Sequence, residues 1–315
     1  MRTLYPLQDS SETLQDTAIA IGVFDGVHRG HQEILKQTVR EARSQGLTPV
    51  ALTFDIHPTE LFAPHQSPPY IASLPQRVEL MATHGGGIEA VAVARFDWDF
   101  AGLSPEAFVA DVLEGALGAR HVLVGADFCY GSRRSGSVTT LLRDGARNGF
   151  AVTVVPPILI GGERVSSTQI RGLVAGGDLP AAIGLLGHPF VVQGVVGHGK
   201  RLGWTLGFPT ANLVPTQPGQ LLPGDGIYAA YARLADGRAL RAAVSVGTNP
   251  TTDRDGGRKI EAFLMDGFAE DVYDQPLSLD FRRKVRDEAR FDSLDALIDQ
   301  MDRDVAEIAA FLQPS

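Results

Sequence analysis

Residues 17–31 read Thr-Ala-Ile-Ala-Ile-Gly-Val-Phe-Asp-Gly-Val-His-Arg-Gly-His, and this stretch decides how the first part of the chain folds. The apolar run over residues 17–23 is typical of a buried parallel strand. A glycine-containing turn follows it, and after His31 apolar residues recur at helical spacing up to Val39. The stretch therefore predicts a strand, a tight turn and a helix.

The predicted turn is a place where open α/β sheets bind ligands, because the helix N-terminus offers free N–H groups and a partial positive charge. His28 and His31 are three residues apart, so both can face a ligand from the first helical turn. Imidazoles there can stabilise charge that develops on a phosphoryl group. A plain pair of surface histidines is the alternative, and the small and acidic residues around them argue against it: Gly22, Asp25, Gly26 and Gly30.

The same alternation continues along the first part of the chain. Further buried strands are expected over residues 48–54, 88–94, 121–125 and 151–155, and helices over residues 76–84, 138–148 and 179–186 and from Ser104 onward. Residues 58–75 are rich in proline, have no internal period, and are expected to form a loop. Strands that alternate with helices predict a doubly wound parallel sheet.

The motif Gly-x-Phe-Asp-Gly-Val-His-x-Gly-His resembles the signature of prokaryotic bifunctional FAD synthetases, which join a riboflavin kinase to an FMN adenylyltransferase. Its core, His-x-Gly-His, is shared by the wider nucleotidyltransferase superfamily and alone indicates only the reaction class. The flanking residues 24–27 narrow the resemblance to the flavin branch. The resemblance implies that His28 and His31 are catalytic and that nucleotide is contacted by Gly22, Phe24, Asp25, Gly26 and Gly30.

Other blocks of this half resemble the same family. His57 and Pro58 follow the second strand and are implied to contact flavin, although Ile56 stands where the family usually has proline. The block Gly-Ala-Asp-Phe-Cys-Tyr-Gly over residues 125–131 resembles the family's Gly-x-Asp/Asn-Phe-x-Phe-Gly, which makes Asp127 a nucleotide contact. The basic loop over residues 132–136 could meet phosphate or be a solvated turn.

The block Ser-Ser-Thr-Gln-Ile-Arg over residues 166–171 is a hydroxyl-rich helix start with an arginine one turn in. Such a start supplies N–H groups, hydroxyls and a forked cation to one phosphate chain, although similar caps occur on many helices. With the histidine turn it forms the second phosphate clamp expected of an adenylyltransferase. We expect Ser167 and Thr168 to bind nucleotide and Arg171 to be catalytic.

A second domain is expected after Gly187, so that residues 1–186 form the adenylyltransferase domain and residues 187–315 the riboflavin kinase domain. Short alternating strands are expected over residues 190–196, 226–234, 239–246, 259–265 and 277–284. They predict a small closed all-β barrel. A final helix over residues 293–312, with Asp292 as its cap, carries an apolar stripe expected to pack into the core.

The loops of the barrel carry its chemistry. The glycine-rich loop with Gly197, Gly199 and Gly203 lacks the Walker pattern and is a weak signal of nucleotide binding on its own. It leads into Leu-Gly-Phe-Pro-Thr-Ala-Asn over residues 206–212, which resembles the riboflavin kinase signature. The resemblance implies that Thr210 and Asn212 hold Mg²⁺ and the nucleotide phosphates, and oxygen ligands of this kind suit Mg²⁺.

Two further residues are assigned by their position in the family's motifs. Glu261 resembles the general base that takes a proton from the ribityl 5′-hydroxyl of riboflavin, a task that suits a carboxylate. Arg286 resembles the arginine that closes over the flavin. The chain departs from the family's usual residues at three places in this domain: Trp204, Thr252 and Phe263.

Composition excludes several classes of protein. The chain has 37 acidic and 28 basic residues and a net charge of −9, which argues against non-specific binding to nucleic acid. Its one cysteine, Cys129, excludes an internal disulfide. Without a signal-peptide core or an apolar run of roughly 18 residues, we expect a cytoplasmic protein with no membrane partner. The sequence leaves self-association open.

The motifs predict an enzyme that phosphorylates riboflavin to FMN with ATP and then adenylylates FMN with a second ATP, giving FAD and pyrophosphate, with Mg²⁺ in both steps. One alternative is an enzyme with a single activity whose other domain is a scaffold. A second is adenylylation of another phosphate, such as that of pantetheine, which would leave the barrel motif unexplained. A third is a flavin-binding protein without turnover.

Overall fold

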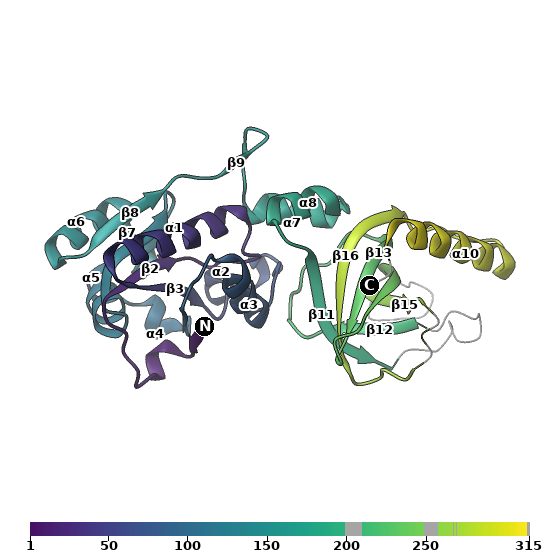
Figure 1. Cartoon of the computed structure of the whole chain (residues 1–315), viewed down its shortest axis with the longest axis horizontal. Coiled ribbons are helices and arrows are strands. Elements are labelled where there is room, and N and C mark those ends of the chain that lie inside the picture. The colour runs from purple at the N-terminus through teal and green to yellow at the C-terminus, as the bar shows by residue number, and fades with distance from the viewer. Residues whose placement is uncertain (199–209, 249–257, 267, 269, 314–315) are drawn as a thin grey trace. The chain divides into compact units, whose positions relative to one another are not determined.

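A six-stranded, all-parallel sheet forms the centre of the first half of the molecule (Figure 1), in the order β1-β4-β3-β2-β5-β8. Its strands are β1 Arg2–Leu4, β2 Thr17–Ile21, β3 Thr48–Phe54, β4 Ala90–Ala94, β5 Ala119–Gly125 and β8 Ala151–Val155. Five of these strands were predicted. The three-residue β1 is too short to show a period, and it is held by parallel pairing with β4.

The computed structural model describes residues 1–198, 210–248, 258–266, 268 and 270–313. The chain divides into two units, of which the first comprises Met1–Pro68 with Ser73–Ser167 and the second comprises Pro69–Ala72 with Thr168–Ser315. Each unit is considered by itself below. The domain boundary near Gly187 stays a prediction.

Helices cover both faces of the parallel sheet, which is the doubly wound arrangement predicted. On one face α1 (Arg29–Gln45) and α3 (Leu74–His84) pack through Leu35, Val39 and Met81 against the strands. The other face is covered by α4 (Trp98–Ala101), α6 (Val138–Asn148), and α5 (Pro105–Ala107), which continues as the π-helical stretch η3 (Phe108–Ala116). The stop predicted after residue 84 is confirmed, since α3 ends at His84.

The region over residues 58–75 is not the plain loop that was predicted. It begins with a short helix, α2 (Pro58–Phe62), and continues with a 3₁₀ turn, η2 (Pro64–Gln66). Proline at the first helical position is pre-set for a helix start, and His57 caps the turn. Smaller elements complete this unit: η1 Leu7–Asp9, β6 Cys129–Tyr130, η4 Ser132–Arg134, β7 Gly136–Ser137, β9 Leu159–Ile160 and β10 Glu163–Arg164.

The second unit is built on a closed antiparallel barrel in the order β11-β12-β15-β14-β13-β16, which confirms the predicted barrel. Helices α7 (Ser167–Gly176) and α8 (Leu179–Leu186) precede it. Its strands are β11 Phe190–Gly197, β12 Thr210–Pro215, β13 Gly226–Leu234, β14 Ala239–Thr248, β15 Arg258–Leu264 and β16 Pro276–Arg286. Strand β12 was not predicted as a strand, because it places only Ala211 and Leu213 in the interior.

Helix α10 (Leu294–Phe311) packs on the outer face of the barrel through Ile308 and Leu312, beside Ala229 and Met265. The apolar stripe of this helix is therefore core packing near its C-terminal end. At its N-terminal end Leu294 is 56% exposed, so the prediction does not hold there.

The predicted cap of α10, Asp292, is also wrong. Ser293 Oγ accepts a hydrogen bond from Ala296 N at 3.1 Å, because Ser293 has the extended backbone of a cap residue.

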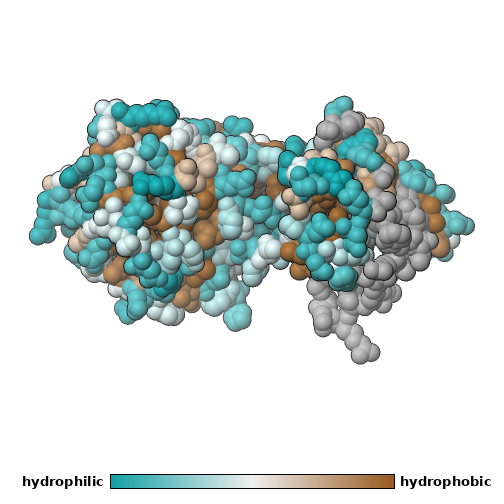
Figure 2. Space-filling model, turned by 60° about the horizontal axis from the view of Figure 1, so that its bottom comes forward, coloured by the Kyte–Doolittle hydropathy of each residue, from teal (hydrophilic) through white to brown (hydrophobic). Residues whose placement is uncertain are grey.

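One face of the molecule shows how polar and apolar residues are distributed. On the face drawn in Figure 2, hydrophilic residues (teal) cover most of the described surface and hydrophobic ones (brown) are scattered among them. Among the described residues, none of the helices has both the length and the apolar character that crossing a bilayer requires.

Candidate functional sites

The turn after β2 is a buried main-chain loop with an unusual backbone. Phe24, Gly26 and Val27 have positive φ values of 52°, 76° and 36°, a region that residues with a side chain seldom occupy. Phe24 and Val27 are fully buried, and Asp25 is 2% exposed. Packing therefore holds the loop in a strained shape, and such strain is concentrated at functional loops.

His28 is the N-cap of α1. Its Nδ1 accepts a hydrogen bond from His31 N at 3.3 Å, and the two imidazoles stack with centroids 3.6 Å apart and 16° between their planes. Because Nδ1 accepts, the proton of the neutral His28 ring lies on Nε2. His28 is 5% exposed, so its ring orientation is set by the protein.

Two glycines of the motif make room for these rings. A Cβ added at Gly30 would lie 3.1 Å from the His28 imidazole, and one at Gly22 would lie 3.2 Å from the Phe24 ring. Both distances are tighter than ordinary van der Waals contact. A side chain at either position would therefore push the neighbouring ring by a few tenths of an ångström.

The side chain of Arg77, on α3, holds the shape of the turn. The sequence analysis did not single out this residue. Its guanidinium donates to Val23 O at 2.8 Å, Phe54 O at 3.0 Å and Asp55 O at 3.0 Å, so it ties together the ends of β2 and β3. Arg77 is fully buried on α3. Its position on the apolar face of a predicted helix is the sequence feature that could have pointed to Arg77.

The end of β3 carries the residues predicted to meet flavin. Asp55 Oδ1 accepts from Ile56 N and from Phe96 N, both at 2.8 Å. His57 Nδ1 accepts from Thr59 N at 3.2 Å and so caps α2, with Pro58 next to it. The structure thus gives these residues a role in shaping the loop, and their contact with flavin stays a prediction.

Asp127 lies just after β5, where it pairs with an arginine that the sequence analysis also missed. Arg164 Nη2 lies 2.7 Å from Asp127 Oδ2. Desolvation, which raises the pKa of Asp127, is outweighed by the hydrogen bond and charge of Arg164, so that pKa is lowered. The charge of Arg134 lowers the pKa of Asp127 further. Arg133, the residue before Arg134, is exposed.

The hydroxyl-rich motif at the start of α7 is divided between the two units. Ser167 Oγ donates to Asp25 O at 3.1 Å, so the structure brings Ser167 to the histidine turn. Thr168 and Arg171 belong to the second unit. There Arg171 Nε donates to Pro69 O at 2.8 Å.

The barrel gathers its predicted residues in one row across neighbouring strands. Gly197 pairs with Asn212, Asn212 pairs with Glu261, and Glu261 pairs with Ser245. Residues directly opposite each other in antiparallel strands have Cβ atoms roughly 5 Å apart on the same face. The neighbours Ala211, Ile260 and Ala262 point into the barrel and are buried, so the row lies on its outer face.

The row continues through Ile227 to Arg286, whose side chain is held in an ion pair. Arg286 Nη2 lies 2.6 Å from Asp304 Oδ2 on α10, and Nε donates to Asp304 Oδ1 at 2.9 Å. Gln300 Nε2 donates to the same carboxylate at 2.8 Å. Arg286 is therefore placed at one end of the row by α10.

Phe263 packs against the apolar cluster beneath α10, which accounts for an apolar residue at that position. The remaining predicted residues of this domain, Gly199 and Gly203, and the departures Trp204 and Thr252 lie outside the described residues.

The oxygen-bearing side chains of the row suit a hard cation. Thr210 and Asn212 are two residues apart on β12 and so share a face, and Glu261 lies opposite Asn212. A hydroxyl, an amide oxygen and a carboxylate are the kinds of ligand that Mg²⁺ accepts beside substrate phosphates. Across the described parts of the chain, no cluster of three or more His, Cys, Asp or Glu side chains could hold a metal ion. The donor set fits Mg²⁺ better than a softer metal.

Each half of the chain matches one known protein family. Residues 10–169 match the FAD synthetase family and residues 186–312 match the riboflavin kinase family. The bifunctional riboflavin kinase/FMN adenylyltransferase of Escherichia coli (strain K12) is 37% identical over 306 residues, which is 96% of each chain. The protein of the same name from Listeria monocytogenes is 35% identical and covers 99% of this chain and 98% of its own.

A solved structure is also similar over the whole chain. The crystal structure described as a macrolide-efflux protein from Streptococcus pneumoniae has a TM-score of 0.83 and 29% identity, and the match covers 99% of both chains. The enzyme class predicted from the motifs, which combines a riboflavin kinase with an FMN adenylyltransferase, is confirmed by the two family matches and the full-length relatives. This chain belongs to the family of bifunctional riboflavin kinase/FMN adenylyltransferases.

Proposed function

We propose that the residues described above divide the synthesis of FAD into two steps, one in each unit. The barrel transfers the γ-phosphoryl group of ATP to the 5′-hydroxyl of riboflavin, giving FMN and ADP. The first unit then transfers the adenylyl group of a second ATP to the phosphate of FMN, giving FAD and pyrophosphate. The observations that support this most are the stacked pair of His28 and His31 at the turn after β2 in the first unit and the pairing of Asn212 with Glu261 on the barrel.

In the kinase step Glu261 accepts the proton of the ribityl hydroxyl as that oxygen attacks the γ-phosphorus. Thr210 and Asn212 hold the metal and the nucleotide phosphates, with the Gly197 strand end beside them. When bound, Mg²⁺ neutralises charge on the transferred phosphoryl group. Arg286 reaches the flavin from the other end of the row. Positioning and charge neutralisation supply most of the rate.

In the adenylyl step no strong base is needed, because the attacking FMN phosphate is already anionic. The Nε2–H of His28, with His31 stacked on it, donates to oxygen atoms of the triphosphate as charge builds on them. The main-chain N–H groups at the start of α1 add to this. Ser167 holds the same phosphate chain, and Asp127 meets the rest of the nucleotide. The roles of Thr168 and Arg171 in nucleotide binding stay predictions of the motif. Mg²⁺ serves here too as charge compensation.

The ligands of this enzyme are therefore riboflavin, FMN, FAD and ATP. A cytoplasmic setting, in which ATP is at hand for both steps, is part of the proposal. Neither step calls for nucleic acid or a membrane, and neither requires self-association.

A chromatographic time course with riboflavin, ATP and Mg²⁺ tests the division of labour. The parent should convert riboflavin to FMN and then to FAD. His28→Ala should stop at FMN, and Glu261→Ala should make no FMN but still convert supplied FMN to FAD. Two matched controls should behave as the parent: His65→Ala, an exposed histidine of the first unit, and Glu307→Ala, whose ion pair with Arg283 is exposed.

Different failures point to different errors. A parent that makes FMN and no FAD would show that the first unit is not an adenylyltransferase for FMN. Loss of both steps in His28→Ala would show that the two activities share one site.

A further inference from the structure

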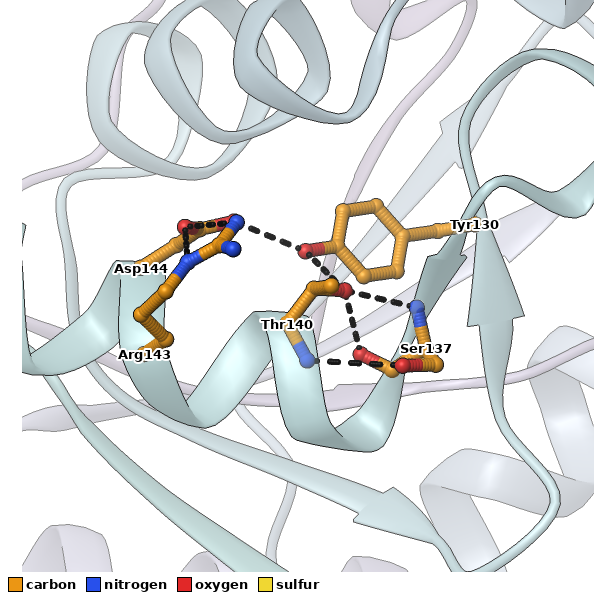
Figure 3. Close-up of polar contacts among 5 residues, drawn as sticks. All are labelled: Tyr130, Ser137, Thr140, Arg143 and Asp144. Atoms are coloured by element: carbon orange, nitrogen blue, oxygen red, sulfur yellow. Dashed lines mark hydrogen bonds and ion pairs between the residues drawn. The ribbon is translucent and has the colours of Figure 1, made fainter.

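A polar network joins the base of the β6–β7 hairpin to helix α6 (Figure 3). Strand β6 pairs with β7 in antiparallel register, and α6 begins directly after β7. The Tyr130 hydroxyl donates to Asp144 Oδ2 at 3.2 Å and lies 3.3 Å from Thr140 Oγ1. The hydroxyl therefore fastens the first strand of the hairpin to the first two turns of the helix.

The partners of this hydroxyl are themselves fixed. Arg143 donates to Asp144 Oδ1 through Nε at 3.1 Å and Nη2 at 3.0 Å, which leaves Oδ2 for Tyr130. Ser137 N donates to Thr140 Oγ1 at 2.7 Å as part of a capping box. Asp144 is 7% exposed and Tyr130 is 6% exposed, so water competes little for these hydrogen bonds.

The ring of Tyr130 does not need its hydroxyl to stay in place. It stacks on the Phe128 ring, with the two centroids 5.6 Å apart, and packs against the Phe108 ring, with the centroids 5.4 Å apart. A Cβ at Gly136 would lie 2.7 Å from the ring, so this face is filled as well. The family block quoted above has phenylalanine at this place. The hydroxyl thus adds one thing only, the polar link to α6.

The link bears on the loop that carries Asp127. Tyr130 is three residues beyond Asp127, and Phe128 N donates to Gly125 O at 3.1 Å, so the loop between β5 and β6 is short and closed. Fixing Tyr130 therefore fixes one end of this loop. Burial raises the pKa of the Tyr130 hydroxyl, which keeps it a donor at neutral pH.

We propose that the Tyr130 hydroxyl is a positioning group for adenylyl transfer. By holding the hairpin on α6 it keeps Asp127 where the nucleotide is bound. This inference rests on the proposed adenylyl-transfer function of the first unit.

The test is Tyr130→Phe, assayed for the conversion of FMN to FAD at varied ATP. The KM for ATP should rise about tenfold, the effect of one lost hydrogen bond to a charged acceptor, with kcat changed less. The thermal midpoint should fall little, because the ring still packs. Riboflavin phosphorylation by the same sample should match the parent. Tyr231→Phe, which removes the hydrogen bond from Tyr231 Oη to Gln313 O, should leave the adenylyl step unchanged.

A second variant keeps the test decisive if Tyr130→Phe folds poorly. Asp144→Asn has nearly the same shape, and it should raise the KM for ATP in the same way, while the double variant should show no further rise. A KM for ATP unchanged in both single variants overturns the proposal. So does an equal loss of both half-reactions, which would mark a merely structural role. A parent that makes no FAD from FMN refutes the proposed function itself, and the inference falls with it.

Discussion

At the end of β2 the proposed phosphate-binding turn is made of buried main chain, whereas on the barrel the proposed reacting groups are side chains that project from neighbouring strands. The turn depends on three positive φ values and on the buried guanidinium of Arg77. The row on the barrel depends on strand register, which sets Asn212 opposite Glu261, and on the ion pair with Asp304 that holds Arg286 at its end. The turn should therefore be sensitive to packing, and the row to the identity of single side chains.

The largest effect is expected from Arg77→Met. Three carbonyl groups, those of Val23, Phe54 and Asp55, would lose a buried donor, which should lower the free energy of unfolding by roughly 3 kcal/mol. Adenylyl transfer should be lost with it. Chemical denaturation, followed beside both half-reactions, checks this. Arg147→Met, an exposed change on α6, should stay within about 0.5 kcal/mol of the parent.

The second effect separates packing from chemistry inside the turn. In Gly30→Ala the added Cβ would push on the His28 imidazole, and a shift of this kind should slow adenylyl transfer about 100-fold while the kinase step is kept. Steady-state rates of the two half-reactions measure it. Gly184→Ala on α8, where nothing lies within 4 Å of the new Cβ, is the matched control. Equal rates for Gly30→Ala and the parent would show that the ring has room to move.

On the barrel the corresponding change is Asn212→Ala. It removes one proposed ligand of the metal and the nucleotide phosphates, so riboflavin phosphorylation should fall about 100-fold at fixed Mg²⁺. The free energy of unfolding should hardly change, since Asn212 is only half-buried on the outer face. A large fall in stability with little loss of rate would reverse the contrast between the two sites.

The smallest effect is a pH dependence in the first unit. His121 is buried between Gln45 and Thr153, and burial lowers its pKa below 6.5 despite the nearby charge of Glu41. The unfolded chain then binds the proton more readily, so this histidine should destabilise the fold as pH falls below about 6.5.

Chemical denaturation of the parent and of His121→Gln, each at about pH 7.5 and about pH 5.5, gives the loss of unfolding free energy on acidification for both proteins. The variant should lose less stability on acidification. An equal or greater loss in the variant would contradict the assignment.

Local patterns in the sequence account for the placement of most residues in the two candidate sites. The glycines and histidines of residues 22–31 are close in sequence, and a strand that ends in such a turn places them without help from distant residues. The row on the barrel could be predicted residue by residue from the motif, but the pairing of Asn212 with Glu261 appears only in the register.

The residues that the sequence analysis missed act across long separations. Arg77 reaches Val23 over 54 positions, and Arg164 reaches Asp127 over 37. No local period marks such pairs, because their geometry exists only once the strands are stacked. The wrong cap of α10 has a nearer cause, since Asp292 and Ser293 are both good cap residues and only the backbone at Ser293 selects between them.

The most direct test of two complete sites in one chain is a mixing experiment. His28→Ala and Glu261→Ala are each incubated with riboflavin, ATP and Mg²⁺, alone and together, and FAD is measured. Neither variant alone should make FAD, and the mixture should, because FMN released by the first can be adenylylated by the second. A mixture that makes FMN but no FAD, although Glu261→Ala converts supplied FMN, would contradict the account.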